Sequence, residues 1–392
     1  MLQPHLNLMA ESSSTNSGAQ IIPPPPPLEK SGWGDLNVIK NIQKKTLRWY
    51  RKNKRDLPWR RTTDPYAIWV SEIMLQQTQV ATVIPYYKNF LKSFPSVRDL
   101  AKSDLSKVLK VWEGLGYYSR ARNLHRASQI VSNHYHGEIP DQLKDLRTLP
   151  GIGRYTAGAI LSIAFNKEAP VLDGNVKRVL SRLFAIADSP VRGQTEGLLW
   201  HLSESLLPKG HASSFNQGLM DLGAMLCTPK EPRCSQCPLR DLCKGRASGD
   251  PERFPVRTLK KKIPHIEAVS AVILKNGRVL LRQRPPEGLL GGLWEFPNWK
   301  NEEKKTSRLR LRLRNYIKKE MRMTVEVNEL IGSFRQTFSH FKLTLQVFHC
   351  HYLNGKAKGK WVPIQKLHAF PMSRIHRRIA EKIDRKAQLS FS

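Results

Sequence analysis

Four of the five cysteines in this chain lie close together in the sequence and could hold a metal centre. They are separated by six, two and five residues, and they are Cys227, Cys234, Cys237 and Cys243. Four thiolates in one short loop can bind a tetrahedral zinc ion or a four-iron cluster. Zinc ribbons usually show two well-separated cysteine pairs, so the uneven spacing favours an iron–sulfur centre. Cys350 lies apart in an alternating apolar run, which predicts a buried structural thiol.

Two glycines on either side of one apolar residue indicate a tight hairpin. Gly151 and Gly153 flank Ile152 and directly precede an apolar helical pattern. Glycine permits a positive φ and a close backbone approach, and the free N–H groups at a helix start can bind phosphate. The segment therefore predicts a hairpin that can bind a phosphate, with an ordinary corner between two helices as the alternative.

Two acidic residues have positions that suit acid–base and electrostatic chemistry. Asp173 directly precedes a predicted helix, where it could act as an N-cap or stabilise positive charge in a reaction. Glu72 lies in another predicted helix, on a different face from the apolar residues, so it could be solvated. In a partly apolar pocket, which Leu57, Trp59 and Trp69 could supply, a carboxylic acid would instead keep its proton near neutral pH.

The order of hairpin, aspartate and cysteine loop resembles that of the helix-hairpin-helix DNA glycosylases, the endonuclease III superfamily. The segment from Arg55 to Gln79, with its Leu57–Arg60 and Trp69–Glu72 motifs, further resembles the adenine DNA glycosylases of the MutY type. That family excises adenine mispaired with 8-oxoguanine or guanine. The resemblance therefore implies duplex DNA as the partner and one [4Fe-4S] cluster held by the four cysteines.

The resemblance also implies the catalytic residues. Glu72 would protonate the adenine ring and Asp173 would stabilise the oxocarbenium-like sugar, with Tyr155 and Asn175 as helpers around the sugar. Endonuclease III has a lysine at the position of Tyr155, and that lysine forms the Schiff base of its strand-nicking reaction. Because a tyrosine cannot form a Schiff base, we expect a monofunctional enzyme that leaves an abasic site.

Adenine must leave the duplex to react, and the resemblance implies residues that hold it and that open the duplex. The extruded base would be surrounded by Arg55, Leu57, Trp59 and Gln217. The DNA contacts would be made by Gln77 and Tyr117, which wedge into the duplex, and by Gly151 and Gly153 of the hairpin. The neighbouring Trp112 and Tyr118 are expected in the core.

The C-terminal region resembles the Nudix-like lesion-recognition domain of the same family. The residues implied to contact oxidised guanine are Gly292, Phe338, Ser339 and His340. A working Nudix hydrolase binds Mg²⁺ through an acidic helix. The corresponding stretch here, about Arg314–Glu320, carries Lys318 and Lys319 instead, and magnesium requires oxygen ligands. Nudix hydrolysis is therefore not expected.

Several helices must position these residues. The spacing of Tyr66, Trp69, Val70, Ile73 and Met74 predicts one, with Asp64 as N-cap and Pro65 at the first position. Further helices are predicted at Thr156–Phe165, Gly174–Ala187 and Leu198–Leu207.

Beyond a polar, proline-rich linker the apolar period changes to two, which indicates strands. Two strands are predicted to meet at the turn Asn276-Gly277, another spans Leu343–His351, and a helix begins at about Ser373. Strict alternation predicts a strand at Arg308–Arg314, where the resemblance would instead place a helix.

The predicted fold class is multidomain, with an all-α helix-hairpin-helix glycosylase domain and an α+β Nudix-like domain. The predicted parts are a disordered tail (1–35), the helical domain (36–246) with its cysteine loop (227–243), a linker (247–265), and the Nudix-like domain (266–392).

The composition is strongly basic, with 65 Lys and Arg against 32 Asp and Glu, a formal charge of +33 and a pI near 10.2. This excess predicts a polyanionic partner. Much of it is expected to grip DNA without base contacts. It lies beside Tyr117, in the cysteine loop and in three further stretches: Arg120, Arg122 and Arg126, then Lys260–Lys262, Arg308–Arg314 and Arg374–Arg378. The sequence has no apolar run of about 18 residues and no export or transit signal, so we expect a cytoplasmic, nucleoid-associated monomer without membrane contact.

Two other functions fit parts of the sequence. One is an endonuclease III-like pyrimidine glycosylase that also cuts the strand, against which Tyr155 and the C-terminal domain argue. The other is a protein that binds lesions without catalysis, against which Glu72, Asp173 and the four cysteines argue.

Overall fold

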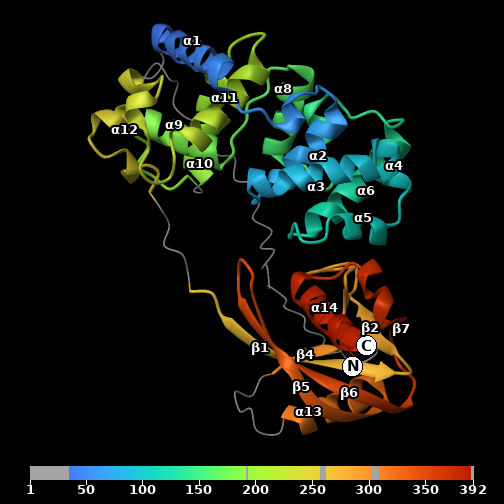
Figure 1. Ribbon diagram of the computed structural model, residues 1–392. Helices are drawn as coiled ribbons and strands as arrows, with labels where there is room; N and C mark the ends of the chain where they lie inside the picture. Colours follow the sequence, from blue (N-terminus) through green and yellow to red (C-terminus); the bar gives the residue numbers. More distant parts are fainter. Residues whose placement is uncertain (1–34, 191–192, 257–261, 302–308, 390–392) are drawn as a thin grey trace. The chain divides into compact units, whose positions relative to one another are not determined.

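The computed structural model describes residues 35–190, 193–256, 262–301 and 309–389, and these form two compact units (Figure 1). The helical unit comprises the described residues up to 101 together with 126–256. The sheet unit comprises 102–125 together with the described residues from 262 onward. The predicted tail lies outside the described residues except for Asp35, and so do residues 257–261 of the predicted linker.

The helical unit is built from helices packed around one apolar core. It contains α1 (Leu36–Asn53), η2 (Pro58–Arg60), α2 (Pro65–Leu75), α3 (Val80–Ser93), most of α4 (Val97–Lys102), the second half of α6 (Ser119–His134), α7 (Leu143–Leu146), α8 (Arg154–Phe165), α9 (Gly174–Leu183), α10 (Gly193–Ser205), α11 (Ala212–Met225), η3 (Cys234–Gln236), η4 (Arg240–Leu242), α12 (Lys244–Ala247) and η5 (Pro251–Arg253). Val176, Leu199 and Phe215 join α9, α10 and α11 in the core.

Helix α2 begins as predicted but is buried more completely than its apolar stripe suggests. The Asp64 side chain accepts a hydrogen bond from the N–H of Tyr66 at 3.0 Å, and Pro65 occupies the first helical position. Every residue from Tyr66 to Met74 is buried. Glu72 is therefore enclosed within the unit, as the predicted pocket requires, and the alternative of a solvated helix face is wrong.

Helix α9 starts where predicted and ends earlier. It stops at Leu183, and the N–H of Ile186 turns back to the carbonyl of Ser181 at 2.8 Å. Ala185 adopts a positive φ of 52°, a conformation that ends helices. The apolar run continues past this point to Ala187, which is why the sequence pattern overestimates the helix.

The sheet unit contains a mixed, seven-stranded sheet. The strand order is β3-β2-β1-β6-β5, β4 also pairs with β1, and β7 pairs with β2. The strands are β1 (His265–Lys275), β2 (Arg278–Gln283), β3 (Trp294–Glu295), β4 (Asn298–Lys300), β5 (Met323–Thr337), β6 (Lys342–Gly355) and β7 (Lys360–Pro363). Strands β1 and β6 are parallel, whereas the other pairs are antiparallel. Asn276 and Gly277 both have positive φ, as the predicted two-residue hairpin requires.

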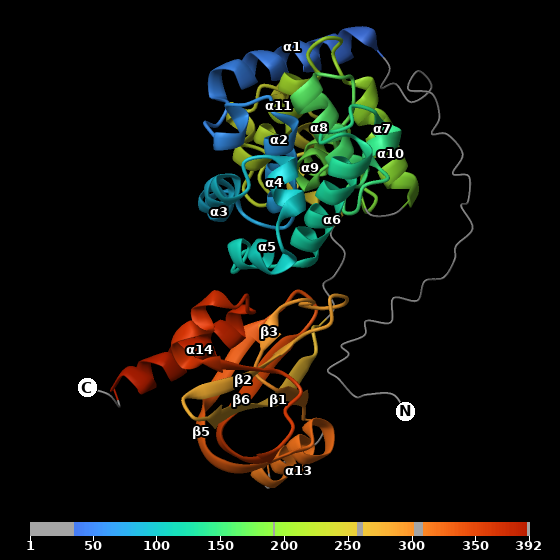
Figure 2. The same cartoon turned by 90° about the vertical axis from the view of Figure 1, so that its right-hand side faces the viewer.

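Two helices cover opposite faces of this sheet (Figure 2). Ala268 and Val272 of β1 pack with the side chains of α14 (Arg374–Leu389). Val269 and Ile273 of the same strand pack with α13 (Leu309–Met321). Because successive strand residues point to opposite faces, one strand contributes to both cores. The buried Cys350 belongs to the α13 side, as expected of a structural thiol.

The predicted strand at Arg308–Arg314 is wrong, because the described part of that segment opens helix α13. Its buried residues are Leu309, Leu313, Ile317 and Met321, a spacing of four. Leu311, which completes the apparent alternation, is 52% exposed. The alternation of arginine and leucine is thus compatible with one apolar helix face as well as with a strand.

Residues 102–125 belong to the sheet unit, and they contain α5 (Leu105–Val111) and the start of α6. The Tyr118 hydroxyl donates to the carbonyl of Met372 at 3.2 Å, and Arg377 donates to the carboxylate of Glu113 at 2.6 Å. Arg122 donates to the carbonyls of Gly288 and Gly291, both at 3.0 Å. These two hydrogen bonds give Arg122 a role within the sheet unit, and its contact with DNA stays a prediction.

Candidate active site

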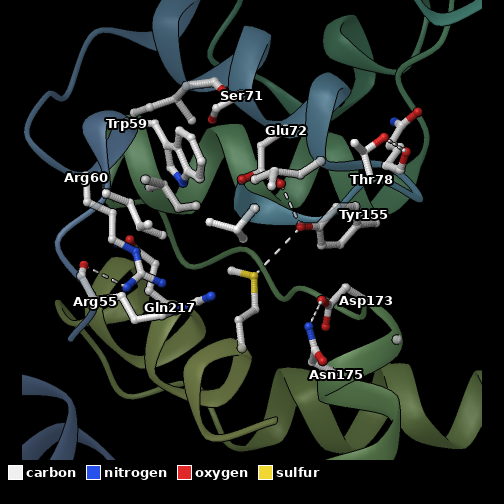
Figure 3. A pocket seen from close by; sticks show the side chains of 18 of the residues that line it. Arg55, Trp59, Arg60, Ser71, Glu72, Thr78, Tyr155, Asp173, Asn175 and Gln217 are labelled. Carbon is white, nitrogen blue, oxygen red and sulfur yellow. Dashed lines mark hydrogen bonds between the residues drawn. The ribbon is translucent and has the colours of Figure 1, made fainter. Parts of the chain in front are cut away.

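A cavity of about 490 Å³ lies within the helical unit (Figure 3). It is lined by residues of η2, α2, α8, α9 and α11 and of the adjoining loops. Nine of the predicted site residues line it: Glu72, Tyr155, Asp173, Asn175, Arg55, Leu57, Trp59, Gln217 and Gln77. The structure therefore brings together side chains that are far apart in the sequence and that include both predicted catalytic carboxylates.

Glu72 is enclosed in this cavity and holds its proton more strongly than an exposed glutamate. Its side chain projects from α2, and the Tyr155 hydroxyl donates to Glu72 Oε2 at 2.6 Å (Figure 3). Burial raises the pKa of Glu72 from 4.5 to about 7. The hydrogen bond from Tyr155 opposes this rise, the charge of Asp173 adds to it, and Arg60 opposes it. Near neutral pH the carboxyl group can therefore give up a proton or take one back.

Asp173 is both the N-cap of α9 and a wall of the cavity. Its Oδ1 accepts from the N–H of Val176 at 2.7 Å, and its Oδ2 accepts from Nδ2 of Asn175 at 2.9 Å. Burial raises the pKa of Asp173 above its usual range, while these two hydrogen bonds and Arg178 lower it. The capping and functional roles of this residue are thus compatible, since the capping hydrogen bonds fix the carboxylate that the functional role needs.

An aspartate that the sequence reasoning missed anchors two arginines at the edge of the cavity. Asp221 of α11 is fully buried, and its Oδ1 accepts from Arg55 Nε at 2.7 Å and from Arg60 Nη2 at 2.8 Å. A buried carboxylate needs such partners. Arg60 belongs to the Leu57–Arg60 motif, so the sequence already placed it in the segment that resembles the family. The sequence did not show that Arg60 pairs with Asp221.

Replacing Asp221 by alanine is expected to lower the free energy of unfolding by about 3–5 kcal/mol, because buried cations lose their partner. The Arg60 side chain is only 10% exposed, so water does not replace the lost carboxylate. Urea denaturation of the two proteins measures the difference. Asp56→Ala removes the exposed partner of Arg61 and serves as the control, for which little change is expected. Equal loss in both variants would contradict this assignment.

The apolar part of the cavity is formed by Leu57 and Trp59, which are both 6% exposed. The Trp59 ring packs edge-on against Tyr87, with ring centroids 5.4 Å apart. Gln217 is held by its own helix, since its Nε2 donates to the Ser213 carbonyl at 3.3 Å and to the Ser213 hydroxyl at 3.1 Å. Flat apolar walls with a fixed amide at one side suit a planar heterocyclic base.

The two predicted wedge residues share an unusual backbone conformation. Gln77 has a φ of 57° and Tyr117 a φ of 48°, a conformation that is uncommon for non-glycine residues. Gln77 lines the cavity, whereas Tyr117 belongs to the sheet unit and is 44% exposed.

Arg120 lies 5.4 Å from the ring centres of both Tyr117 and Trp112. It is 8% exposed, so the prediction that it grips DNA is wrong, and its contacts instead stabilise the loop of Tyr117.

The glycine hairpin has the predicted geometry. Gly151 has a φ of 82°, Ile152 is buried, and Gly153 is the N-cap of α8. Both glycines are exposed. Since Gly153 has no side chain to cap the helix, the first N–H groups of α8 face outward from an exposed turn, as phosphate binding requires.

The four cysteines form a partly buried loop against the core of the helical unit. Cys227, Cys237 and Cys243 pack against that core. Burial, together with the charges of the other three thiolates, raises the pKa of Cys237 to about 11. The thiols are thus close enough to repel one another as thiolates. Among the described residues, however, no three Cys, His, Asp or Glu side chains converge as the ligands of a single ion.

A buried arginine stabilises this loop. Arg182 is 2% exposed, and its guanidinium donates to Cys227 Sγ at 3.4 Å, to the Thr228 carbonyl at 2.7 Å and to the Phe254 carbonyl at 3.0 Å. Cys243 Sγ in turn donates to the Arg182 carbonyl at 3.4 Å. Four thiols beside a buried cation are a donor set that fits an iron–sulfur cluster with four cysteine ligands.

A second cavity, of about 450 Å³, lies within the sheet unit. It is lined by residues 114–122 around Tyr117, by Gly288–Leu290, by Gln336–His340 and by Ser373 and Arg374. It therefore includes the predicted Phe338, Ser339 and His340. Gly292 is not among the lining residues. It has a φ of 77°, and a Cβ at this position would lie 3.0 Å from Leu109 Cδ1.

None of the helices in the described part of the chain combines the length and apolar character needed to cross a membrane.

Two protein-family models match the chain. The model of the HhH-GPD superfamily of base excision DNA repair proteins matches residues 70–205, and the model of the NUDIX domain matches residues 268–382. These matches and the observed elements confirm the predicted fold class, a helical glycosylase-type domain followed by a Nudix-like α+β domain.

Known proteins are similar over most of the chain. The adenine DNA glycosylase of Buchnera aphidicola (subsp. Acyrthosiphon pisum) is 40% identical over 298 residues, which cover 76% of this chain and 83% of that protein. The adenine DNA glycosylase of Homo sapiens is 37% identical, over 80% of this chain and 67% of that protein. The solved structure of a thermostable thymine-DNA glycosylase is 33% identical, with a TM-score of 0.50, and covers 54% of this chain and 98% of that one. The solved structure thus corresponds to about half of this chain.

Proposed function

Because this chain belongs to the adenine DNA glycosylase family, and is therefore an enzyme that removes adenine from DNA in base excision repair, we propose that its substrate is adenine paired with 8-oxoguanine or guanine. We further propose that it cuts only the glycosidic bond. The observation that carries the proposal is the buried Glu72, hydrogen-bonded to Tyr155 in a cavity that also contains Asp173.

In the proposed reaction, the adenine enters the cavity of the helical unit and Glu72 donates a proton to a nitrogen of its ring. The bond between the base and the sugar then breaks, and its electron pair stays with the neutral adenine. The ionised Asp173 stabilises the positive charge that develops on the sugar. Water adds to the sugar carbon and returns a proton to Glu72, which leaves an abasic site.

The nature of Tyr155 supports a monofunctional enzyme. Burial beside Glu72 raises the pKa of its hydroxyl well above 10, so the group remains a hydrogen-bond donor. It is not a nitrogen nucleophile and cannot form the Schiff base on which strand nicking depends.

The cavity of the sheet unit supports recognition of the base opposite adenine. Phe338 and Phe341 are stacked with ring centroids 4.5 Å apart, and the exposed Ser339 and His340 carry donors and acceptors suited to a base edge. Tyr117 lines the same cavity. We infer that the oxidised guanine or guanine is read here, while adenine reacts in the helical unit.

Single-turnover release of adenine from a duplex with one A·8-oxoguanine pair tests the function. We expect adenine release, an alkali-labile strand that stays intact without alkali, and no borohydride-trapped complex with abasic DNA. Strong trapping would favour a bifunctional enzyme, and binding without release would favour a lesion-binding protein.

The rate of adenine release is expected to fall by about tenfold per pH unit above about pH 7, because Glu72 must be protonated to act as the acid. Asp173 must be ionised, so the rate also falls at acid pH. Tyr155→Phe removes the hydrogen bond that lowers the pKa of Glu72, and this should move the alkaline limb to higher pH. Single-turnover rates across pH test the assignment, and an unshifted limb in Tyr155→Phe would contradict it.

We also propose that Cys227, Cys234, Cys237 and Cys243 hold one [4Fe-4S] cluster. Bound there, the cluster would cross-link the loop that follows α11, and Arg182 would offset its negative charge. Cys237→Ser should lower the iron content of the purified protein and its thermal unfolding midpoint. Cys350→Ser alters a buried cysteine of the sheet unit and should keep the iron. Unchanged iron in Cys237→Ser would contradict the proposal.

A further inference from the structure

Helix α13 presents a row of cations on the side that does not face the sheet. Leu309, Leu313, Ile317 and Met321 are buried against the sheet. The exposed residues include the cations Arg310, Arg314, Lys318, Lys319 and, directly after the helix, Arg322. The ion pairs found within the described ranges involve none of these five cations.

The stability of the helix does not explain this row. The first turn of α13 contains no acidic residue, and Arg310 lies where the helix dipole disfavours a cation. Arg310 and Arg314, and then Arg314 and Lys318, are four residues apart, a spacing at which like charges repel. Only the cations near the C-terminal end are favoured by the dipole. The arrangement therefore suits an external polyanion.

The row is long enough to span several phosphates of a nucleic-acid backbone. Arg310, Arg314, Lys318 and Arg322 recur every four residues, about 6 Å apart along the axis and about 18 Å in total. A DNA strand presents a phosphate about every 3.4 Å along the duplex axis. The row can thus follow one strand over several phosphates, and its positive side chains can reach them without base contacts.

The row of cations on α13 and the cavity of the sheet unit lie on different sides of the sheet. Arg374, the first residue of α14, lines that cavity together with Phe338 and Ser339. Helix α13 packs on the other face (Figure 2). A duplex segment held at the cavity is therefore not the segment that α13 contacts.

We propose that α13 binds a second segment of duplex DNA, separate from the segment that carries the mispair. Such a contact lets the protein reach a new segment before it leaves the old one. The inference rests on the proposed DNA substrate but not on the chemistry of adenine removal. It also gives a role to five cations that contribute to the formal charge of +33.

The test compares the full chain with Arg310→Gln/Arg314→Gln/Lys318→Gln. Dissociation of a labelled duplex is followed while unlabelled duplex is added. In the unsubstituted protein the dissociation rate should rise with competitor concentration, because competitor held at α13 can take the place of the labelled duplex when that duplex partly detaches. In the variant the rate should not depend on the competitor. The binding constant of the second duplex should also depend less on salt. The slope of its logarithm against the logarithm of the salt concentration should decrease in magnitude by about 3, since each phosphate contact contributes about 0.9.

A matched control removes three exposed cations with the same spacing from α1, as Lys40→Gln/Lys44→Gln/Arg48→Gln. It should behave like the unsubstituted protein.

The α13 substitutions remove repulsion between like charges and an unfavourable cation near the positive end of the helix dipole. That variant should therefore fold normally and release adenine at the single-turnover rate of the unsubstituted protein. Equal competitor dependence in the α13 variant, or equal loss in the α1 control, would overturn the inference. Equal acceleration by polyglutamate would also overturn it, in favour of an acidic polypeptide partner. If none of the three proteins releases adenine, but only the α13 variant loses the dependence of the dissociation rate on competitor, the proposed function fails and this inference stands.

Discussion

Glu72→Gln should lower the single-turnover rate of adenine release by about 10²- to 10⁴-fold, the usual contribution of general acid catalysis. Glutamine has nearly the same shape and can still accept the hydrogen bond from Tyr155. It has no acidic proton to give to the departing base. The substitution therefore removes the chemistry and retains the packing of a helix that is buried on all sides.

The control for this experiment is Glu138→Gln, which changes an exposed glutamate of the same unit and should leave the rate unchanged. Affinity for the mispaired duplex is measured in parallel and should be retained in Glu72→Gln. Full release of adenine by Glu72→Gln would overturn the proposed mechanism, because nothing else in the proposal protonates the base.

Asp173→Asn should lower the rate by about 10²- to 10³-fold, which is the usual effect of removing one electrostatic contact to a developing charge. Asparagine is as good an N-cap as aspartate, so the N–H of Val176 keeps its acceptor and α9 keeps its start. The thermal unfolding midpoint should therefore hardly change. The experiment separates the two roles of this residue, because only the negative charge is lost.

Asp64→Asn provides the matched control for Asp173→Asn. It makes the same exchange at the N-cap of α2, at a side chain that does not line the cavity. Neither its rate nor its stability should change. A normal rate in Asp173→Asn would contradict the electrostatic role and leave Asp173 as a cap alone.

Much of the candidate site could be predicted because its signals are local. The N-caps at Asp64 and Asp173 and the turn at Asn276-Gly277 depend on neighbouring residues, and the structure has each of them. The family-like segments placed Glu72 and Tyr155 in one pocket, although their mutual hydrogen bond spans 83 positions. The roles of these residues stay predictions until the variants are measured.

Features that depend on long-range packing could not be predicted. Nothing near Asp221 in the sequence shows that it meets Arg55 and Arg60, because these partners are more than 160 residues away. The basic character of Arg120 and Arg122 suggested DNA contacts, yet both side chains stabilise the sheet unit. Helix α13 was predicted as a strand because alternation over a few residues cannot distinguish a period of two from a helix with apolar residues four apart.

The contacts of Arg182 have a consequence for how the helical unit would open locally. The guanidinium that donates to Cys227 Sγ and Thr228 also donates to the Phe254 carbonyl, which is close to the end of the described helical unit. The cysteine loop and the last described residues of this unit are therefore fastened to the same buried side chain of α9. Damage to the loop would leave this guanidinium with fewer partners, so the loop and the segment around Phe254 would open together as one local unit.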